Sequence, residues 1–400
     1  MTQVARTTRT EPQGSSRGLA ARVSLGRRFT PVPPEFMMIA STALLLTIFG
    51  LVMVLSATSA DAVSQGGHPM DGAVKQGIFA VIGIPLMFAI SRLPVAFIKK
   101  LAWPALFGAV AVQMLVFTPL GIEDGGNRNW IKIAGYSLQP SEFLKLALAV
   151  WIGFVLMRKQ TMLGTWHQVF IPVVPVSALA IATVVGGRDL GTSMVLVLIM
   201  LGCLFFSGVK LRLFIIPVIL GALVVLVLAV TSADRMRRIT AVCSDMSNYE
   251  RDCYQTIHGL WGMATGGVFG VGLGNSQEKY GWLPAAANDF IFAIVGEELG
   301  LIGCLVVLAL FATFAVGVFH IIRKTTDPFI RIAAGGITVW IVGQAIFNIG
   351  VVVAMFPVMG VPLPFMSQGG TALLAVLIAC GVLLAFARTL PAAERDKVTR

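Results

Sequence analysis

The stretch that decides the fold of this chain is PAAANDFIFAIVGEELG, residues 284–300. It opens an apolar run from about residue 289 to about residue 320, and about 20 apolar residues are enough to cross a bilayer as a helix. Three carboxylates, Asp289, Glu297 and Glu298, lie at the start of that run. Because a charge at bilayer depth costs about 2.5–3.5 kcal/mol on insertion scales, such residues indicate a functional site. Asp289 comes first, where the chain enters the bilayer and a carboxylate can still meet water.

The two later acids are expected to have a structural role. A helix turns by about 100° per residue, which places Glu297 about 80° and Glu298 about 180° away from Asp289 around the helix axis. The three groups therefore cannot face one pocket. We interpret Glu297 and Glu298 as deep groups that are hydrogen-bonded or paired.

The composition is that of a polytopic membrane protein. Hydrophobic residues make up 56% of the 400 residues and charged residues only 12%, against about 25% charged residues in soluble domains. The net charge of +11 does not indicate nucleic-acid binding, because the basic residues lie mostly in short loops and tails between apolar runs, which is a topology signal.

The apolar runs predict an all-α fold with about ten transmembrane helices and one long structured extracytoplasmic loop, residues 233–288, between spans seven and eight. Residues 36–389 form a single membrane domain in this interpretation, flanked by a disordered cytoplasmic tail at residues 1–35 and a second cytoplasmic tail at residues 390–400. The predicted spans are 36–57, 76–91, 101–119, 141–157, 168–186, 190–208, 212–232, 289–320, 333–356 and 369–388.

The basic residues give the orientation. With the N-terminus inside, 20 of the 30 lysines and arginines fall on the cytoplasmic side and nine on the outer side. The positive-inside rule therefore predicts that both termini face the cytoplasm.

The cysteines and histidines predict no metal site. Cys243 and Cys253 lie ten residues apart in the outer loop, where a disulfide is expected, with two free thiols as the alternative. The four histidines are scattered along the chain.

Polar clusters between spans supply the candidate substrate-binding residues, and all of them fall on the predicted outer side. They lie in GNRNWIK (126–132), QPSEFLK (139–145), GRDLGTS (187–193), the segment before span eight, and PVMGVPLPFMSQGG (357–370). A transporter would place ionisable groups near the midplane, so the one-sided distribution favours an enzyme. The candidates are Arg128, Lys132, Gln139, Ser141, Glu142, Lys145, Arg188, Asp189, Gln255 and Ser367.

Each cluster also has a structural interpretation. Glu142 and Lys145 share a helix face at i,i+3 spacing and are equally well explained as a structural ion pair. Residues 187–193 fit a tight polar turn, although an Arg beside an Asp at a helix start also suits an anion. The prolines and glycines of residues 357–370 fit a rigid loop.

Taken together, these segments resemble the SEDS family, the FtsW/RodA peptidoglycan glycosyltransferases, over roughly residues 36–390. The matching motifs are Gln-Pro-Ser-Glu at 139–142, Asp-Leu-Gly-Thr-Ser at 189–193, Asp-Phe-Ile-Phe at 289–292 with Gly-Glu-Glu-Leu-Gly at 296–300, and Pro-Leu-Pro-Phe-Met-Ser-Gln-Gly-Gly at 362–370. Residues 126–130 and 288–292 look more like the division member, FtsW, than RodA.

The resemblance implies polymerisation of lipid II into glycan strands on the outer face of the cytoplasmic membrane, with Asp289 as the catalytic residue. It also implies a class B penicillin-binding transpeptidase as partner, alongside other membrane proteins of the divisome and membrane lipid, with no nucleic acid. A divalent cation is possible, and no ligand set is predicted. Relatives often carry Glu and His shortly before the aspartate, where this chain has Ala285 and Ala287, so neither group is an essential proton carrier here.

The predicted mechanism makes Asp289 a general base that takes the proton of the acceptor sugar 4-hydroxyl, with inversion and undecaprenyl pyrophosphate as the leaving group. Cations near the leaving group are expected from Arg188, Arg128, Lys132 and Lys145. The alternatives are a lipid II flippase, an elongation polymerase of the RodA type, and a non-catalytic division scaffold.

Overall fold

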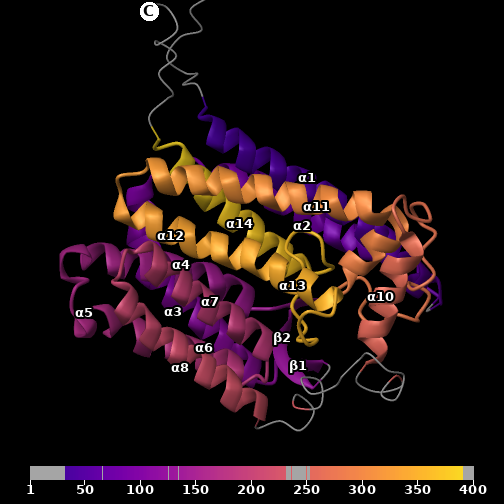
Figure 1. Cartoon of the computed structure of the whole chain (residues 1–400), viewed down its shortest axis with the longest axis horizontal. Helices are drawn as coiled ribbons and strands as arrows, with labels where there is room; N and C mark the ends of the chain where they lie inside the picture. The colour runs from indigo at the N-terminus through magenta and orange to yellow at the C-terminus, as the bar shows by residue number, and fades with distance from the viewer. Residues whose placement is uncertain are drawn as a thin grey trace, which may run out of the picture.

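The structure is a computed structural model that describes residues 32–64, 66–124, 126–133, 135–230, 236, 249 and 253–390. Nearly all of both predicted tails, and most of the first half of the predicted outer loop, lie outside these residues. Within them the chain is a bundle of long helices (Figure 1), as expected for a chain whose backbone groups must be satisfied inside an apolar medium.

Each of the ten predicted spans falls on a helix or on consecutive helices. The bounds are α1 (Pro34–Ser64), α2 (Asp71–Ile90), α3 (Val95–Met114) with η1 (Leu115–Phe117), α4 (Ser141–Arg158), α5 (Trp166–Phe170) with α6 (Val173–Val185), α7 (Leu190–Phe206), α8 (Leu211–Val230), α11 (Ile291–Lys324), α12 (Pro328–Thr338) with the π-helical turn η4 (Val339–Gly343) and α13 (Gln344–Val352), and α14 (Gly370–Ala387). A short turn, η2 (Gln160–Met162), follows α4, and α10 (Tyr254–Gly266) lies in the predicted outer loop.

Seven segments of the described chain are long and apolar enough to cross a membrane, so the protein is a multi-pass membrane protein. The remaining predicted spans coincide with α4, α7 and α8, which are shorter in their described part or carry more charge. Membrane crossing by these three helices stays a prediction.

A small sheet, which the sequence did not predict, follows η1. Strands β1 (Gly121–Asp124), β2 (Asn127–Ile133) and β3 (Tyr136–Leu138) form an antiparallel sheet in the order β1-β2-β3. Ile131 of β2 pairs with Gly121 on one side and with Leu138 on the other. The sheet joins the end of η1 to the start of α4, and the backbone N–H of Arg128 anchors it by donating to the carbonyl of Gly187 at 2.8 Å.

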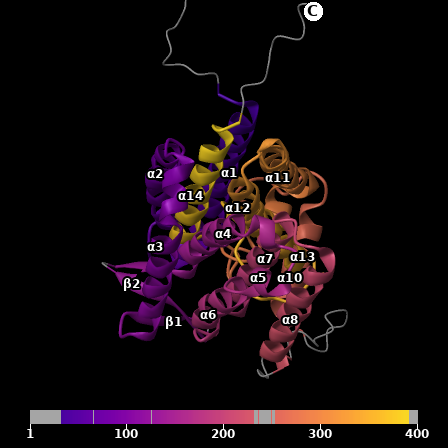
Figure 2. The same cartoon turned by 90° about the vertical axis from the view of Figure 1, so that its left-hand side faces the viewer.

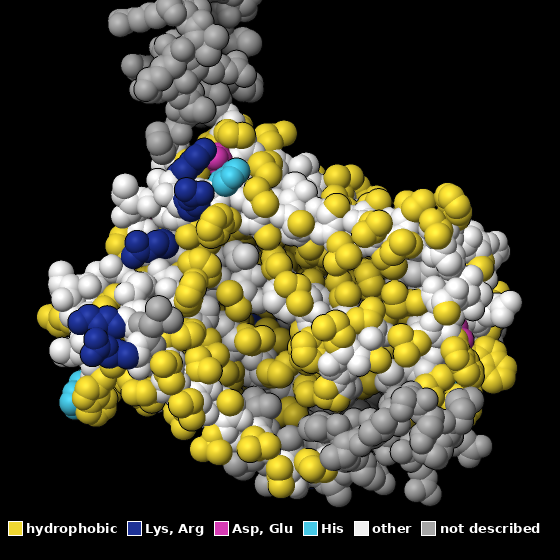
Figure 3. All heavy atoms as spheres, viewed as in Figure 1, with side chains coloured by type: hydrophobic (Ala, Val, Ile, Leu, Met, Phe, Trp, Pro, Cys, Tyr) yellow, Lys and Arg dark blue, Asp and Glu magenta, His cyan; other side chains and the backbone are white. Residues whose placement is uncertain are grey.

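The start of α1 and the end of α14 lie together at one end of the bundle, and the sheet and α10 lie towards the other (Figures 1 and 2). At the terminal end the guanidinium of Arg388 stacks over the Phe36 ring at 4.7 Å. Lys99 on α3 also pairs there with Asp327, the N-cap of α12, at 2.6 Å. On the face shown in Figure 3 the surface is largely apolar, and lysine and arginine side chains gather towards one side.

Helix α11 is broken at Gly300, which adopts a left-handed backbone with φ 66° and ψ −163°. A break leaves amide and carbonyl groups without helical partners, and the loop after α10 supplies them. Leu301 N–H donates to the Gly267 carbonyl at 2.9 Å, and the N–H groups of loop residues 271 and 272 donate to the carbonyls of Glu297 and Glu298, each at 3.0 Å. The loop and the broken helix therefore form one interlocked unit.

Glu297 and Glu298 are buried in this unit, which confirms their structural interpretation. Glu298 accepts from the hydroxyl of Ser56 on α1 at 2.6 Å and pairs with Lys279 at 3.1 Å. Glu297 accepts from the backbone N–H of Gln277 at 2.8 Å. The acids therefore fasten the loop segment 276–279 to α11 and α1.

Candidate active site

Asp289 lies in the turn of residues 284–290 that leads into α11. Its backbone carbonyl accepts a hydrogen bond from the Asn348 side chain of α13 at 2.7 Å. A Cβ added to Gly360 would stand 3.6 Å from Asp289 Oδ2, so the backbone of the 357–369 loop passes directly beside the carboxylate. The Asp289 side chain is half-buried.

Asp189 is the second carboxylate of the site and is held in place by three donors. It caps α7, where its Oδ1 accepts from the Thr192 N–H at 2.9 Å. Its Oδ2 accepts from Asn129 of β2 at 2.6 Å and from the Gln139 side chain at 3.3 Å. The predicted residues Gln139 and Asp189, 50 positions apart in the sequence, are therefore in direct contact.

The two aspartates affect each other electrostatically. Burial raises the pKa of the Asp289 carboxyl, and the negative charge of Asp189 raises it further, to about 6. Part of the Asp289 surface remains accessible, yet its surroundings are protein rather than bulk water, and the charged form loses hydration. A carboxyl group with this pKa is an effective proton acceptor near neutral pH.

Glu142 and Lys145 form an ion pair at 2.8 Å in which each side chain is only 1% exposed. Lys145 also donates to Gln344 Oε1 at 3.1 Å and lies over the Trp340 ring at 5.2 Å. These contacts match the structural interpretation of the pair. The prediction that Lys145 contacts a leaving group remains a prediction. The contacts of Lys145 with Glu142, Gln344 and Trp340 do not support it.

Ser367 uses its hydroxyl within the protein. It donates to the Asn288 carbonyl at 2.6 Å and accepts from the Leu363 N–H at 2.7 Å. The next residue, Gln368, donates its N–H to the Ala287 carbonyl at 2.8 Å. The loop 357–369 therefore grips the turn that carries Asp289.

Gln255 and Gln76 support the same turn and loop from outside. The side chain of Gln255 on α10 donates to the Pro284 carbonyl at 2.8 Å. Gln76 on α2 donates to the Ser367 carbonyl at 3.1 Å and accepts from the Gly369 N–H at 3.0 Å. Four segments distant in sequence thus meet around one turn.

The outer cations differ in their placement. Arg188 is exposed, directly precedes Asp189 and adopts a left-handed backbone with φ 64°, a conformation that non-glycine residues hold at an energetic cost, often at functional sites. Lys132 is exposed on β2. The guanidinium of Arg128 donates to the Thr118 carbonyl at 2.9 Å and so ties the sheet to η1. Among the described residues, none of these cations forms an ion pair with Asp289.

The described residues fit a divalent cation poorly. Hard cations take six or more oxygen ligands and bind where several carboxylates converge, whereas both oxygens of Asp189 already accept hydrogen bonds from the protein. In the part of the chain that the structure describes, no group of three or more His, Cys, Asp or Glu is placed to hold a metal ion.

Cys253 is disulfide-bonded. Cys243 lies outside the described residues, so pairing between the two stays a prediction. The other cysteines, Cys203, Cys304 and Cys380, are free and buried.

Sequence reasoning missed Asn348 and Gln344, two buried amide side chains four residues apart on α13. Both side chains are uncharged, so they lack the signal that marks an ionisable residue in an apolar span. A polar side chain in an apolar run is a weaker form of the same signal, and it was available in the sequence.

Comparison with known proteins identifies related chains. The family described as cell cycle protein, which comprises FtsW, RodA and SpoVE, matches residues 36–391. The "Probable peptidoglycan glycosyltransferase FtsW" of Mycobacterium tuberculosis (strain ATCC 25618 / H37Rv) is 35% identical over 98% of this chain and 77% of its own length. Stage V sporulation protein E of Bacillus subtilis (strain 168) is 34% identical over 89% of this chain and 97% of its own length.

The fold is also similar to that of a solved chain. A structure of a peptidoglycan synthase complex that coordinates polymerization and crosslinking contains a chain with a TM-score of 0.70. The two are 20% identical, and the match covers 88% of this chain and 96% of the other. This likeness concerns the helical architecture alone.

Proposed function

This chain belongs to the FtsW, RodA and SpoVE family of cell cycle proteins, and from that premise we propose that it is a peptidoglycan glycosyltransferase that polymerises lipid II into glycan strands. The relative in Mycobacterium tuberculosis is named as a probable peptidoglycan glycosyltransferase, FtsW. Because FtsW is the division member of the family, this name supports a role in division over one in elongation. The observation that carries the chemistry is the half-buried Asp289 carboxyl, with a pKa near 6, beside the fixed carboxylate of Asp189.

Asp289 acts as the general base of the transfer. Its carboxylate takes the proton of the acceptor sugar 4-hydroxyl while that oxygen forms a bond to the anomeric carbon of the growing strand. The bond from the anomeric carbon to the diphosphate oxygen breaks, and its electron pair leaves with undecaprenyl pyrophosphate. Attack opposite to the leaving group inverts the anomeric configuration.

The surroundings of the base suit a hydroxyl-rich ligand. The Asp289 carboxylate is half-buried, and the fixed carboxylate of Asp189 lies beside it. Carboxylate oxygens accept hydrogen bonds, and sugar hydroxyl groups donate them. The acceptor sugar therefore lies on this acceptor-lined side.

The departing diphosphate needs positive charge, because negative charge develops on it in the transition state. Arg188 directly precedes Asp189 in the sequence, and it is exposed. Lys132 lies further along the sheet and serves the rim of the site. We place the diphosphate at the exposed Arg188 rather than at Lys145, whose side chain is only 1% exposed.

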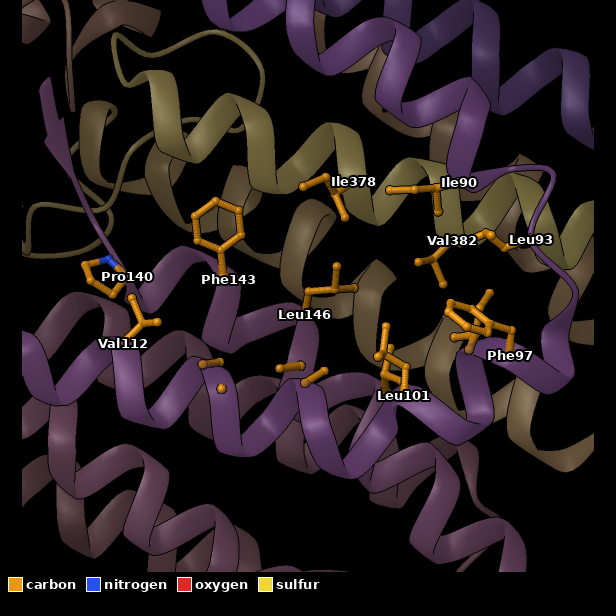
Figure 4. Close-up of a pocket in the computed structure, with 16 residues that line it drawn as sticks. Ile90, Leu93, Phe97, Leu101, Val112, Pro140, Phe143, Leu146, Ile378 and Val382 are labelled. Atoms are coloured by element: carbon orange, nitrogen blue, oxygen red, sulfur yellow. The ribbon is translucent and has the colours of Figure 1, made fainter. Parts of the chain in front are cut away.

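An apolar groove supplies a place for the polyprenyl chain. A cavity of about 560 Å³ lies between α2, α3, α4 and α14, from Leu93 and Phe97 at one end to Pro140 and Phe143 at the other (Figure 4). Pro140 directly follows Gln139, which contacts Asp189, so the groove reaches the polar site. A Cβ added to Gly108 in its wall meets no atom within 4 Å, and Gly108→Phe is expected to fill the groove and raise the KM for lipid II.

The partner is a class B penicillin-binding transpeptidase, which crosslinks the strands that this enzyme makes. The solved chain with the same fold comes from a synthase complex that couples polymerization to crosslinking, which supports this assignment. Both termini face the cytoplasm and the site faces outwards, as the distribution of Lys and Arg indicates.

A polymerisation assay with purified protein, its transpeptidase partner and fluorescent lipid II tests the proposal. Asp289→Asn is expected to abolish strand formation while the protein stays folded. Asp71→Asn is the matched control, since Asp71 is an exposed carboxylate at the start of α2, and it is expected to polymerise at the wild-type rate. Strand formation by the Asp289 variant at a rate near that of wild type would end the proposal, and lipid II translocation without any polymerisation by wild type would support a flippase instead.

A further inference from the structure

Two amide side chains on one face of α13 hold the loop that passes beside Asp289. Gln344 and Asn348 are 2% and 1% exposed and lie one helical turn apart, so that they share a face. Gln344 Nε2 donates to the Pro362 carbonyl at 2.7 Å, and Asn348 Nδ2 donates to the Val361 carbonyl at 2.8 Å. The α13 face thus fixes two successive residues of the loop.

Asn348 differs from Gln344 because it also binds the residue that performs the chemistry. Its Nδ2 donates both to the Asp289 carbonyl at 2.7 Å and to the Val361 carbonyl at 2.8 Å. Both partners are acceptors only, so the orientation of the amide is fixed by chemistry. Its Oδ1 has no hydrogen-bond partner among the described residues, so these two bonds alone orient the side chain.

The bridge spans the two halves of the site. Val361 follows Gly360, which lies against the Asp289 carboxylate. On its other side the same loop segment packs on α7, where a Cβ added to Gly191 would lie 2.6 Å from the Met359 carbonyl oxygen and 2.8 Å from the Val361 side chain. Asp189 caps that helix. Asn348 therefore fixes Asp289 relative to the element that carries Asp189.

The backbone of the turn is held at three successive carbonyls. Those of residues 287 and 288 accept from Gln368 N–H and Ser367 Oγ, both in the loop, and that of Asp289 accepts from Asn348. Of these three bonds, only the third comes from a helix of the bundle, so it ties the Asp289 carbonyl directly to α13. Loss of the Asn348 amide removes its bond to the Asp289 carbonyl in the turn. It also removes its bond to the Val361 carbonyl in the loop that holds the turn.

We propose that Asn348 is a positioning residue of the transferase site, which holds the Asp289 backbone so that the carboxylate stays directed at the acceptor hydroxyl and at a fixed distance from Asp189. The inference rests on the proposed function, and it adds a residue that touches neither substrate nor proton. A displacement of about 1 Å at such a site costs about 100-fold in rate, so the effect is expected in kcat.

Asn348→Leu tests the proposal, because it keeps the shape of the side chain and removes both donated bonds. The expected result is a kcat for lipid II polymerisation about 100-fold lower, with KM near the wild-type value. The midpoint of the acid limb of the rate is also expected to shift, since the distance from Asp289 to Asp189 is no longer fixed. Asn275→Leu is the control, because it removes an exposed amide that donates to the Val271 carbonyl at 3.1 Å. It is expected to leave kcat and the pH midpoint of the rate unchanged.

The amount of folded protein, measured by gel filtration in detergent, separates positioning from general support. Two results would overturn the proposal. One is a kcat and a pH midpoint equal to those of wild type. The other is a loss of activity that equals the loss of folded protein, with no shift in the pH midpoint of the rate. If the leucine variant does not fold, Asn348→Ser, which keeps one small donor, is judged by the same two readouts and is expected to be intermediate. Asp289→Asn is assayed in parallel: activity there defeats the proposed function, whereas an inactive Asp289→Asn beside a normal Asn348 variant defeats the positioning role alone.

Discussion

The polymerisation rate is expected to fall at acid pH through protonation of Asp289, and Asp189→Asn is expected to move that fall to lower pH. The pKa of Asp289 stands at about 6, above its ordinary value of 3.8. A base works only when deprotonated, so kcat/KM is expected to be half-maximal near pH 6 and to drop about tenfold for each further pH unit of acidification. Above that midpoint the carboxylate form dominates and the rate no longer depends on this group.

The variant removes the like charge and leaves the burial, which is the larger cause of the shift. Its midpoint is therefore expected between 3.8 and about 6. Asparagine caps a helix as well as aspartate does, so α7 keeps its start, and Asn129 can turn its amide over to present its unpaired oxygen. The assay is kcat/KM for lipid II from acid to neutral pH at constant ionic strength, with Asp71→Asn as control. Identical midpoints in wild type and variant would refute the coupling, and a wild-type midpoint near 4 would refute the buried base.

Three further substitutions test the buried charges and the broken helix. Lys279→Met leaves the Glu298 carboxylate buried without its cation and is expected to cost about 3–5 kcal/mol of stability, visible as a lower unfolding temperature in detergent; an unchanged temperature would contradict the role of this ion pair. Glu142→Gln and Lys145→Met are each expected to destabilise in the same assay, whereas the double variant, which leaves neither charge, recovers most of the loss; a double variant as unstable as the worse single one would argue against pairing. Gly300→Ala places a side chain on a backbone with φ 66° and against the neighbouring loop. This substitution is expected to cost about 1–3 kcal/mol of stability and to make the loop more sensitive to protease. Protease resistance equal to that of wild type would contradict this expectation.

The helices and the outer clusters were within reach of the sequence. Each predicted span coincides with a helix or with consecutive helices, because an apolar medium imposes helical structure on the backbone. Glu297 and Glu298 were predicted as structural, and the structure gives each a set of partners. The helix-rotation argument for that prediction was wrong, because Asp289 lies in the turn before α11 and not on the helix. The contact between Gln139 and Asp189 was not predicted, since no rule of spacing brings these residues together.

The remaining features depend on tertiary contacts that no local pattern records. The sheet at residues 121–138 consists of strands of three to seven residues, too short for periodicity to separate them from a loop. The break at Gly300 is stable only because a distant loop supplies the missing hydrogen bonds. Asn348 carries no charge, and its importance follows from the two carbonyls that it joins, which lie 13 and 59 residues away.

The acids buried beside the broken helix have a bearing on how the chain is made. Glu297 and Glu298 receive their hydrogen bonds and their cation from Ser56, Ser276, Gln277 and Lys279, all of which precede them in the sequence. During synthesis these partners have therefore already left the ribosome when the two glutamates emerge. The two glutamates therefore enter the hydrophobic segment when their hydrogen-bond donors and their cation are already available. In a chain reordered so that Lys279 came last, the two carboxylates would insert before their cation was synthesised.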